Sequence, residues 1–248
     1  MDRRLAERRR RVAEDRARSN LGRLVRLLTF LVVVAAVVWF LQSPFVSVGE
    51  ITVQGANRVD VTAVLGDHGV VEGRPLLVLD VAGAEESLLS DPWVAQASVA
   101  RDWPTRVVVQ IEERVPAVAA RLKGGWWLVA GDATLLEPVE SPPSNLPRAN
   151  LPDLNAKDSA DGLELAGAVE FLGGLPAHHQ PGAEVRLGAE GLEATVSGFR
   201  VRIGRPFDTA EKAVVAAAMI DSGLEEGGVI TVVAPASPAV LPPEATQK

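Results

Sequence analysis

The apolar segment 27–41 constrains what this chain can fold into more than any other stretch. It contains fifteen residues with no charge and a single hydroxyl group, and the uncharged run continues as far as Gly49. A helix over these 23 uncharged residues is roughly 34 Å long at about 1.5 Å per residue, whereas the hydrocarbon core of a bilayer is about 30 Å thick. Pro44 is expected to end such a helix near Ser43. We therefore predict a transmembrane helix over 27–45, with a buried core helix as the alternative.

The charges on either side of this segment predict its orientation. Residues 1–26 carry ten arginines and four acidic residues, a net charge of +6; because the whole chain carries −7, residues 27–248 carry −13. The positive-inside rule then keeps the basic arm 1–26 in the cytoplasm and places the rest outside. A cleavable signal peptide has a similar head and apolar middle, but Leu41, Ser43 and Pro44 offer a poor cleavage site. We predict an uncleaved single-pass anchor and a disordered arm, which either signals topology or touches anionic lipids.

Composition and motifs argue against most kinds of catalytic site. The chain has no cysteine, so disulfides and thiol chemistry are excluded. The sequence contains no phosphate loop, dinucleotide fingerprint or nucleophile elbow, and the negative charge of residues 27–248 opposes nucleic-acid binding. The histidines are His68, His178 and His179; the last two are adjacent in a loop flanked by Pro and Gly, without the helical spacing of a metal pair. We predict a solvated loop there, and no catalytic residue, cofactor or metal.

Residues 46–114 read as strand, helix, helix, strand, strand. Alternating apolar residues predict three strands, over 48–54, 93–99 and 106–113. Asp60 and Asp80 precede two predicted helices, over 60–65 and 82–89, whose free first-turn amides their carboxylates can accept. Two helices can cover one face of a three-stranded sheet. This segment is therefore expected to be a small two-layer domain.

Residues 115–234 read as a mixed β-domain with two helices. Apolar runs predict strands over 116–121, 126–130, 135–136, 183–187, 192–196, 200–203 and 229–234. The helices are expected over 161–172 and 208–222; Asp208 and Glu211 resemble a capping box, and Val215, Ala218 and Met219 form the expected buried stripe. Residues 141–152 are predicted to be an exposed loop, and the Pro- and Ala-rich tail 235–248 to be disordered.

Several of these stretches resemble the POTRA domain of the FtsQ/DivIB cell-division family. The matching residues are 51–55, 73–76 with Asp80, 91–94, 99–104 and 109–116. Family members have a short cytoplasmic arm, one membrane span, a POTRA domain and a β-domain, and the segments above follow the same order. The resemblance implies an α+β fold in which a β-α-α-β-β POTRA domain precedes the β-domain. It also implies a non-enzymatic division scaffold at the septum that binds FtsB- and FtsL-like membrane proteins.

The resemblance further implies that the C-terminal region of the β-domain receives a partner segment. The predicted strand in this region consists of Val229, Ile230, Thr231, Val232, Val233 and Ala234. At a sheet edge, its unpaired amides and carbonyls could add a partner strand. An ordinary core strand is the alternative, and the family commonly has an acidic residue where Thr231 stands.

Two other functions remain open from the sequence. The exposed sheet edge of the POTRA domain is a second expected contact for division proteins. A membrane-anchored enzyme acting on wall polymer is the alternative function, although no paired carboxylates stand out for glycan hydrolysis. A POTRA-bearing export component is less well supported, because tandem POTRA repeats and a β-barrel are expected in such proteins.

Overall fold

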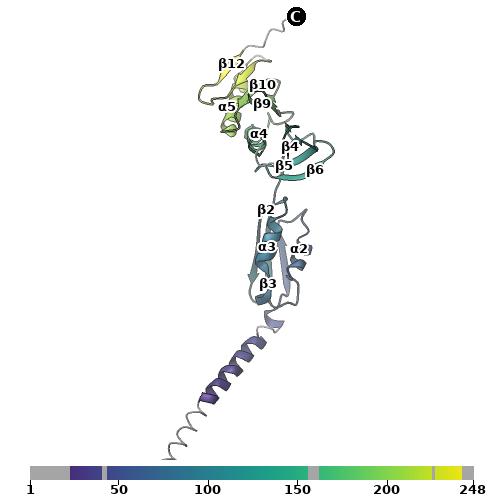
Figure 1. Cartoon of the computed structure of the whole chain (residues 1–248), viewed down its shortest axis with the longest axis vertical. Helices are drawn as coiled ribbons and strands as arrows, with labels where there is room; N and C mark the ends of the chain where they lie inside the picture. Colours follow the sequence, from purple (N-terminus) through teal and green to yellow (C-terminus); the bar gives the residue numbers. More distant parts are fainter. Residues whose placement is uncertain (1–22, 41–43, 156–161, 225–226, 242–248) are drawn as a thin grey trace, which may run out of the picture. The chain divides into compact units, whose positions relative to one another are not determined.

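The computed structural model describes residues 23–40, 44–155, 162–224 and 227–241, and the chain divides into two compact units (Figure 1). Unit 1 comprises the chain as far as Ser90 together with Gln96–Glu112, and unit 2 comprises Asp91–Ala95 and the chain from Glu113 onward. Most of the predicted arm and the last seven residues of the predicted tail, 242–248, lie outside the described residues.

The predicted N-terminal apolar helix is confirmed over Arg23–Phe40. It has a mean hydropathy of 2.2, is long and apolar enough to cross a membrane, and buries none of its residues within the protein. The single hydroxyl in the run is satisfied inside the helix, because Thr29 Oγ1 donates to the Val25 carbonyl at 2.9 Å. After 41–43, which are not described, Pro44–Val46 form a 3₁₀ turn, η1.

Unit 1 contains the predicted β-α-α-β-β order. Its elements are β1 (Glu50–Gln54), α2 (Val61–Asp67), the 3₁₀ turn η2 (Leu76–Val78), α3 (Val81–Leu89), β2 (Val94–Asp102) and β3 (Arg106–Glu113). The three strands form one sheet in the order β1-β3-β2, in which β1 runs parallel to β3. On β3, Val107 and Val109 are fully buried, as their alternation predicts.

Both helices of unit 1 begin where the sequence predicts. Asp60 Oδ1 accepts the amide of Ala63 at 3.1 Å, and Asp80 Oδ1 accepts the amide of Gly83 at 3.0 Å. Each carboxylate therefore satisfies one of the free amides in the first turn of its helix. The apolar sides of these helices bury Leu65 on α2 and Leu88 on α3.

Unit 2 is built on a nine-stranded sheet in the order β12-β11-β10-β9-β8-β7-β4-β5-β6. Its strands are β4 (Pro116–Leu122), β5 (Gly125–Ala130), β6 (Leu135–Val139), β7 (Arg148–Asn150), β8 (Glu184–Gly188), β9 (Gly191–Val196), β10 (Phe199–Gly204), β11 (Val229–Thr231) and β12 (Ala239–Leu241). The β4–β7, β7–β8 and β10–β11 pairs are parallel and the others are antiparallel. The sheet is therefore mixed, as predicted.

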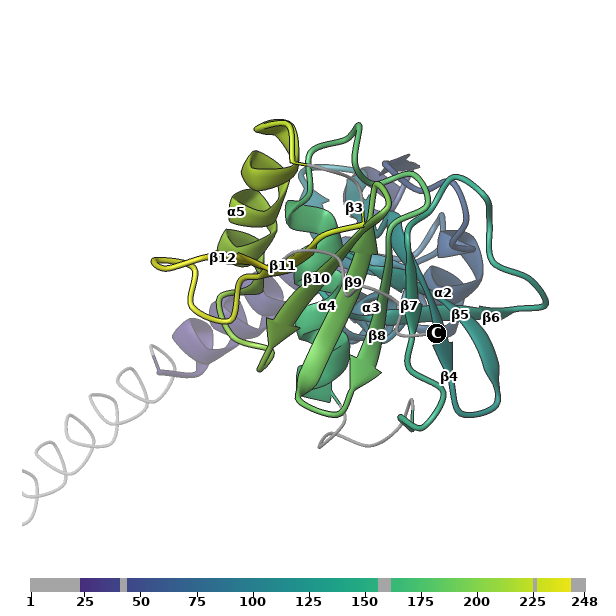
Figure 2. The same cartoon turned by 90° about the horizontal axis from the view of Figure 1, so that it is seen from above.

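Two helices, α4 (Gly162–Gly174) and α5 (Thr209–Asp221), pack together on one face of this sheet (Figure 2). The core between them and the strands contains Phe171 and Leu172 of α4, Val185 of β8 and Ile203 of β10, all with no exposed surface. A smaller apolar cluster lies around β5 and β6 and includes Leu128, Leu136 and the half-buried Trp93. The first cluster carries most of the apolar burial in unit 2.

The Arg114 side chain links two segments of unit 2, the one at Pro92 and Val94 and the one at Asp132. Its Nε donates to Asp132 Oδ2 at 2.8 Å, and its Nη1 donates to the carbonyls of Pro92 and Val94. Burial alone raises the pKa of the Asp132 carboxyl, but hydrogen bonds from Arg114 and Thr134 outweigh it and hold that pKa below its ordinary value.

Three local predictions for unit 2 are wrong. Residues 148–150, expected in an exposed loop, form strand β7 between β4 and β8. Asp208 adopts a left-handed conformation (φ +54°) and makes no side-chain cap bond, so the capping box does not form. Residues 239–241, expected in a disordered tail, form strand β12 against β11.

The buried stripe of α5 is also shifted from its predicted position. Ala213, Ala216 and Ala217 are buried, whereas Ala218 is exposed; of the predicted stripe, the half-buried Val215 and Met219 do pack against the core. Small alanines in these positions let α5 approach the sheet closely.

Candidate partner-binding site

The predicted partner-binding strand lies one position inside the sheet edge. Val229, Ile230 and Thr231 form β11, which pairs with β10 on one side and with β12 on the other. Beyond the strand, the Val232 amide donates to the Arg202 carbonyl at 2.9 Å. The segment was expected to add a partner strand only if it lay at a sheet edge, and β11 does not meet that condition because β12 occupies its outer side.

The burial of the six predicted residues divides them into two groups. Val229, Ile230 and Val232 are at most 8% exposed and belong to the core, as the core-strand alternative requires. Thr231 is half-buried, while Val233 is 52% exposed and Ala234 is exposed. Within this stretch, only the end at 233–234 can make a substantial side-chain contact with another protein.

Strand β12 is the outermost strand at this end of the sheet among the described residues. Val240 pairs with Ile230 and is 42% exposed. The outward-facing amides and carbonyls of an edge strand are a ready template for another strand. The sequence did not indicate this edge, because Pro235, Pro238 and the alanines around them are typical of a tail.

A hollow of about 380 Å³ lies beside Val233. Its wall includes the β9–β10 strands, the loop that leads into α5, and Pro235. Gly204 adopts φ +74°, and a Cβ at this position would lie 3.2 Å from Val233 Cγ2. Glycine therefore allows residue 204 and Val233 to lie close together in the wall of the hollow. Phe207, on the same wall, is 56% exposed. Val233 and Phe207 give the hollow an apolar rim.

The floor of this hollow contains a buried ammonium group. Lys212 is 4% exposed, and its Nζ donates to the Arg205 carbonyl at 2.9 Å. Burial lowers the pKa of Lys212, and the nearby Asp208 carboxylate partly opposes that shift. Arg202 and Glu190 also line the hollow, which therefore combines an apolar rim with charges of both signs. Such mixed surfaces suit a protein segment better than a single small anion.

Unit 1 contains a Ser–His–Asp arrangement that the sequence did not reveal. Ser87 Oγ lies 2.8 Å from His68 Nε2, and His68 Nδ1 lies 3.3 Å from Asp80 Oδ2. Catalysis by such a group also needs free N–H groups beside the serine to stabilise an oxyanion. Ser87 lies in the body of α3, where backbone amides bond within the helix. The arrangement is better suited to tying α2 to α3 than to hydrolysis.

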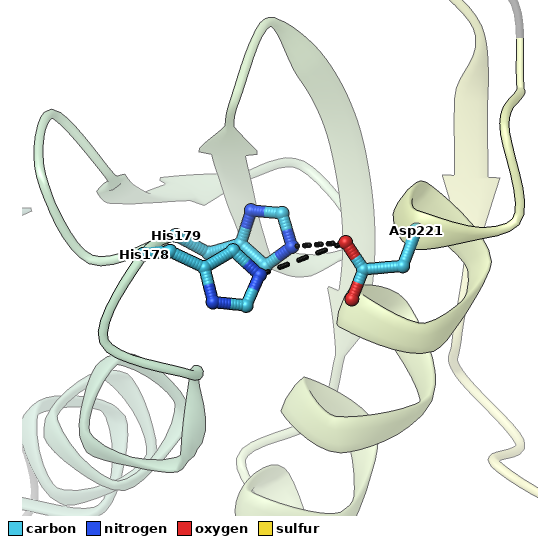
Figure 3. Close-up of side chains that lie close together, drawn as sticks. All are labelled: His178, His179 and Asp221. Atoms are coloured by element: carbon cyan, nitrogen blue, oxygen red, sulfur yellow. Dashed lines mark hydrogen bonds and ion pairs between the residues drawn. The ribbon is translucent and has the colours of Figure 1, made fainter.

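The adjacent histidines of unit 2 do not both lie in solvent. His178 is exposed, but His179 is only 5% exposed, and both imidazoles point toward Asp221 (Figure 3). The prediction of a solvated loop is wrong for His179. Its polar partners come from positions 197 and 221, so no local pattern could have indicated its burial.

Comparison with known proteins agrees with the architecture of unit 1. Residues 46–114 match the model of the POTRA domain, FtsQ-type. The chain is 38% identical over 104 residues to the cell division protein FtsQ of Corynebacterium glutamicum, covering 42% of this chain and 45% of that protein. It is 25% identical over 129 residues to the cell division protein DivIB of Bacillus selenitireducens, covering 51% and 50%.

A longer match reaches into unit 2. The cell division protein FtsQ of Myxococcus fulvus is 28% identical over 176 residues, which cover 67% of this chain and 61% of that protein. The chain thus spans about half to three-fifths of the length of these relatives. The domain match, the named relatives and the β-α-α-β-β order followed by a β-rich region agree. Residues 46–114 thus match an FtsQ-type POTRA domain, and the chain as a whole is similar to cell division proteins named FtsQ and DivIB.

Proposed function

We propose that this chain is a membrane-anchored scaffold of bacterial cell division, which acts by binding other division proteins. The observation that carries the proposal is an FtsQ-type POTRA domain at 46–114 on the same chain as an apolar helix at Arg23–Phe40. In this proposal 46–114 and 115–234 are the two extracytoplasmic domains. A septal location follows from the proposed role in division.

The proposed topology places the basic arm in the cytoplasm and everything beyond the helix outside. The net charge of +6 on residues 1–26 supports it. Because the chain has no cysteine, single cysteines introduced by Ser19→Cys and Ser141→Cys give unambiguous labelling in whole cells. A membrane-impermeant maleimide should label only the Ser141→Cys variant in cells whose outer layers admit it. Labelling of Ser19→Cys alone would reverse the topology.

The proposed partners are the exported segments of FtsB- and FtsL-like membrane proteins. We place their binding at the outer edge of β12, with partner side chains over the apolar rim of Val233 and Phe207. Strand addition supplies main-chain hydrogen bonds, and the rim supplies apolar contact. The exposure of Val233, Phe207 and Val240 supports this placement.

Proline substitutions in β12 test the strand addition. Successive amides in a strand point to opposite sides, so of Ala239→Pro and Val240→Pro only one removes an amide that faces outward. The variant that removes the outward amide should lose binding to the partner segments while its melting temperature is unchanged. The other should weaken the β11–β12 pair and lower the melting temperature. If both variants remain folded and bind the partner segments fully, the binding site does not lie on β12.

An alanine pair tests the apolar rim. Phe207→Ala should weaken partner binding about 5–30-fold in calorimetry with the full chain in detergent, as expected for an aromatic anchor. Val214→Ala is the matched control, because Val214 is 58% exposed on α5 and does not line the hollow. If the two substitutions change the affinity equally, Phe207 is not part of the binding site.

The scaffold is proposed to have no catalytic activity of its own. The similarity to FtsQ and DivIB proteins supports this, as does the position of Ser87, the serine of the Ser87–His68–Asp80 group, in the body of α3. Incubation of the full chain with purified cell wall should release no soluble fragments. If the natural chain releases fragments and the Ser87→Ala variant does not, the protein is a wall enzyme instead.

A further inference from the structure

The structure brings three metal-ligating side chains together at a place with no part in the proposed scaffold. His178 and His179 lie in the loop between α4 and β8, and Asp221 is the last residue of α5. Their three nearest donor atoms all lie within 4.8 Å of one another. Figure 3 shows both imidazoles directed at the same carboxylate. We propose that these residues bind a divalent transition-metal ion, with Zn²⁺ as the best match.

The two distances from the imidazoles to the Asp221 carboxylate suit zinc. His179 Nε2 lies 3.1 Å from Asp221 Oδ1, and His178 Nε2 lies 3.6 Å from the same oxygen. Two ligand atoms that each lie about 2.0–2.1 Å from a tetrahedral zinc ion are roughly 3.3 Å apart. The two separations lie on either side of this value. Two imidazole nitrogens with one carboxylate favour zinc and similar ions over Ca²⁺ or Mg²⁺, which prefer oxygen ligands.

A turn in the backbone brings two neighbouring histidines to the same side. Adjacent residues in an extended chain point in opposite directions. Here the His179 amide donates to the Pro176 carbonyl at 2.9 Å, which closes a turn, and the two ring centroids lie 4.1 Å apart. The Gln180 side chain holds the loop further by donating to the Leu175 carbonyl at 2.9 Å. The imidazoles are thus positioned by the fold before an ion arrives.

Ser197 is a second polar partner of His179 and contacts its other ring nitrogen, Nδ1. Its Nδ1 lies 2.8 Å from Ser197 Oγ, in the tight turn between β9 and β10. Ser197 and Gly198 both have positive φ, +49° and +84°, the pattern of a two-residue type I′ hairpin turn. Metal-bound histidines almost always donate their other N–H to such a partner. In the metal-bound state Nδ1–H would donate to the serine, and the ion would take the Nε2 lone pair in place of the present contact with Asp221 Oδ1.

The end of α5 also favours a cation. The C-terminal end of a helix carries partial negative charge from unpaired carbonyls, so an additional carboxylate there is unfavourable unless a cation neutralises it. Asp221 is such a carboxylate. An ion on it would join the α4–β8 loop to the end of α5, segments about forty residues apart in the chain. We therefore expect zinc to stabilise unit 2.

The test uses the full chain in detergent, purified without a histidine tag, freed of metal and titrated with ZnCl₂ in a calorimeter. One zinc ion should bind per chain, and His178→Ala and Asp221→Asn should each weaken binding at least about tenfold. Both residues are more than half exposed, so their replacement should leave the fold intact. His68→Ala is the matched control, since it removes a histidine of unit 1 and should leave binding unchanged.

Two further readouts separate this site from weak binding to surface acids. Ser197→Ala should reduce affinity about tenfold without removing a ligand. Zinc at about 100 times its Kd should raise the melting temperature of unit 2 by about 5–10 °C, an increase lost in Asp221→Asn. Absence of binding to the unsubstituted chain, or binding that survives both His178→Ala and Asp221→Asn, would overturn the proposal.

Discussion

Unit 1 and unit 2 each contain two helices and a sheet, but α5 of unit 2 begins in a different way from α2 and α3 of unit 1. In unit 1 each helix is preceded by an aspartate that caps it, Asp60 for α2 and Asp80 for α3. In unit 2, Asp208 precedes α5 without capping it, and Thr209 instead donates from Oγ1 to Glu170 Oε2 on α4 at 2.6 Å. The difference indicates that unit 1 is specified by local signals, whereas unit 2 depends on contacts between distant segments.

The largest expected effects come from one fully buried side chain in each unit. Leu88→Ala in α3 and Phe171→Ala in α4 should each lower the free energy of unfolding by about 2–5 kcal/mol, because each leaves a cavity in its core. Calorimetry of the full chain should show that each substitution shifts the transition of its own unit. Exposed Val214→Ala serves as control. A shift of both transitions by either variant would mean that the units unfold together.

The next effect tests the distant contact of α5. Thr209 is fully buried, and Thr209→Val keeps its shape while removing the hydroxyl that donates to Glu170. We expect a loss of about 1–2 kcal/mol in the free energy of unfolding, measured by denaturant titration. Glu170→Gln should cost less, because an amide oxygen can still accept the bond. An unchanged Thr209→Val variant would contradict the role of this contact.

A smaller effect is expected for the local cap of α2. Asp60→Ala removes the acceptor for the Ala63 amide and should cost about 1 kcal/mol. Asp60→Asn is the control, since asparagine caps helices about as well as aspartate. The same denaturant titration measures both, and equal losses would show that charge rather than capping matters at this position.

Acid should remove a small part of the stability of unit 1. The Gly83 amide and then the His68 side chain hold the pKa of the Asp80 carboxyl below its ordinary value. A carboxyl with a lowered pKa in the folded state stabilises the protein above its unfolded pKa of about 3.9, and this contribution disappears as the pH falls further. The difference in melting temperature between the natural chain and Asp80→Asn should therefore shrink as the pH falls below about 4. A difference that grows on acidification would reverse the assigned direction.

The smallest effect is predicted for Asp208. Because Asp208 makes no cap bond and already has positive φ, Asp208→Gly should cost less than Asp60→Ala, and the small loss expected comes from removing the carboxylate near the buried Lys212 ammonium. A loss as large as that of Asp60→Ala would show that the two aspartates act alike, and would remove the contrast between the units.

The sequence predicts best those elements whose causes lie within a few residues. The N-terminal apolar helix, the capped helices of unit 1 and the alternation of Val107 and Val109 on β3 all belong to this group, as does the α+β class. Strand β7 was missed because Pro147 and Pro152 flank three residues that become a strand only between β4 and β8. The burial of His179 likewise depends on Ser197 and Asp221.

The candidate site shows the same limit. Of the segment 229–234, expected to be one strand, only Val229–Thr231 form β11, and the place of β11 one strand inside the edge depends on β12. That strand is three residues long and lies in a Pro- and Ala-rich stretch. Such a short strand has little propensity of its own and forms because β11 offers it a partner.

Strand β7 is one of the short strands through which the sheet of unit 2 carries mechanical load. In the strand order, its three residues join the β4–β5–β6 group to the β8–β12 group. Fewer hydrogen bonds cross there than between the longer pairs β4–β5 or β9–β10. The β10–β11 and β11–β12 pairs are equally short, so a force drawn across the sheet by a bound partner would act on these three-residue junctions before the longer pairs.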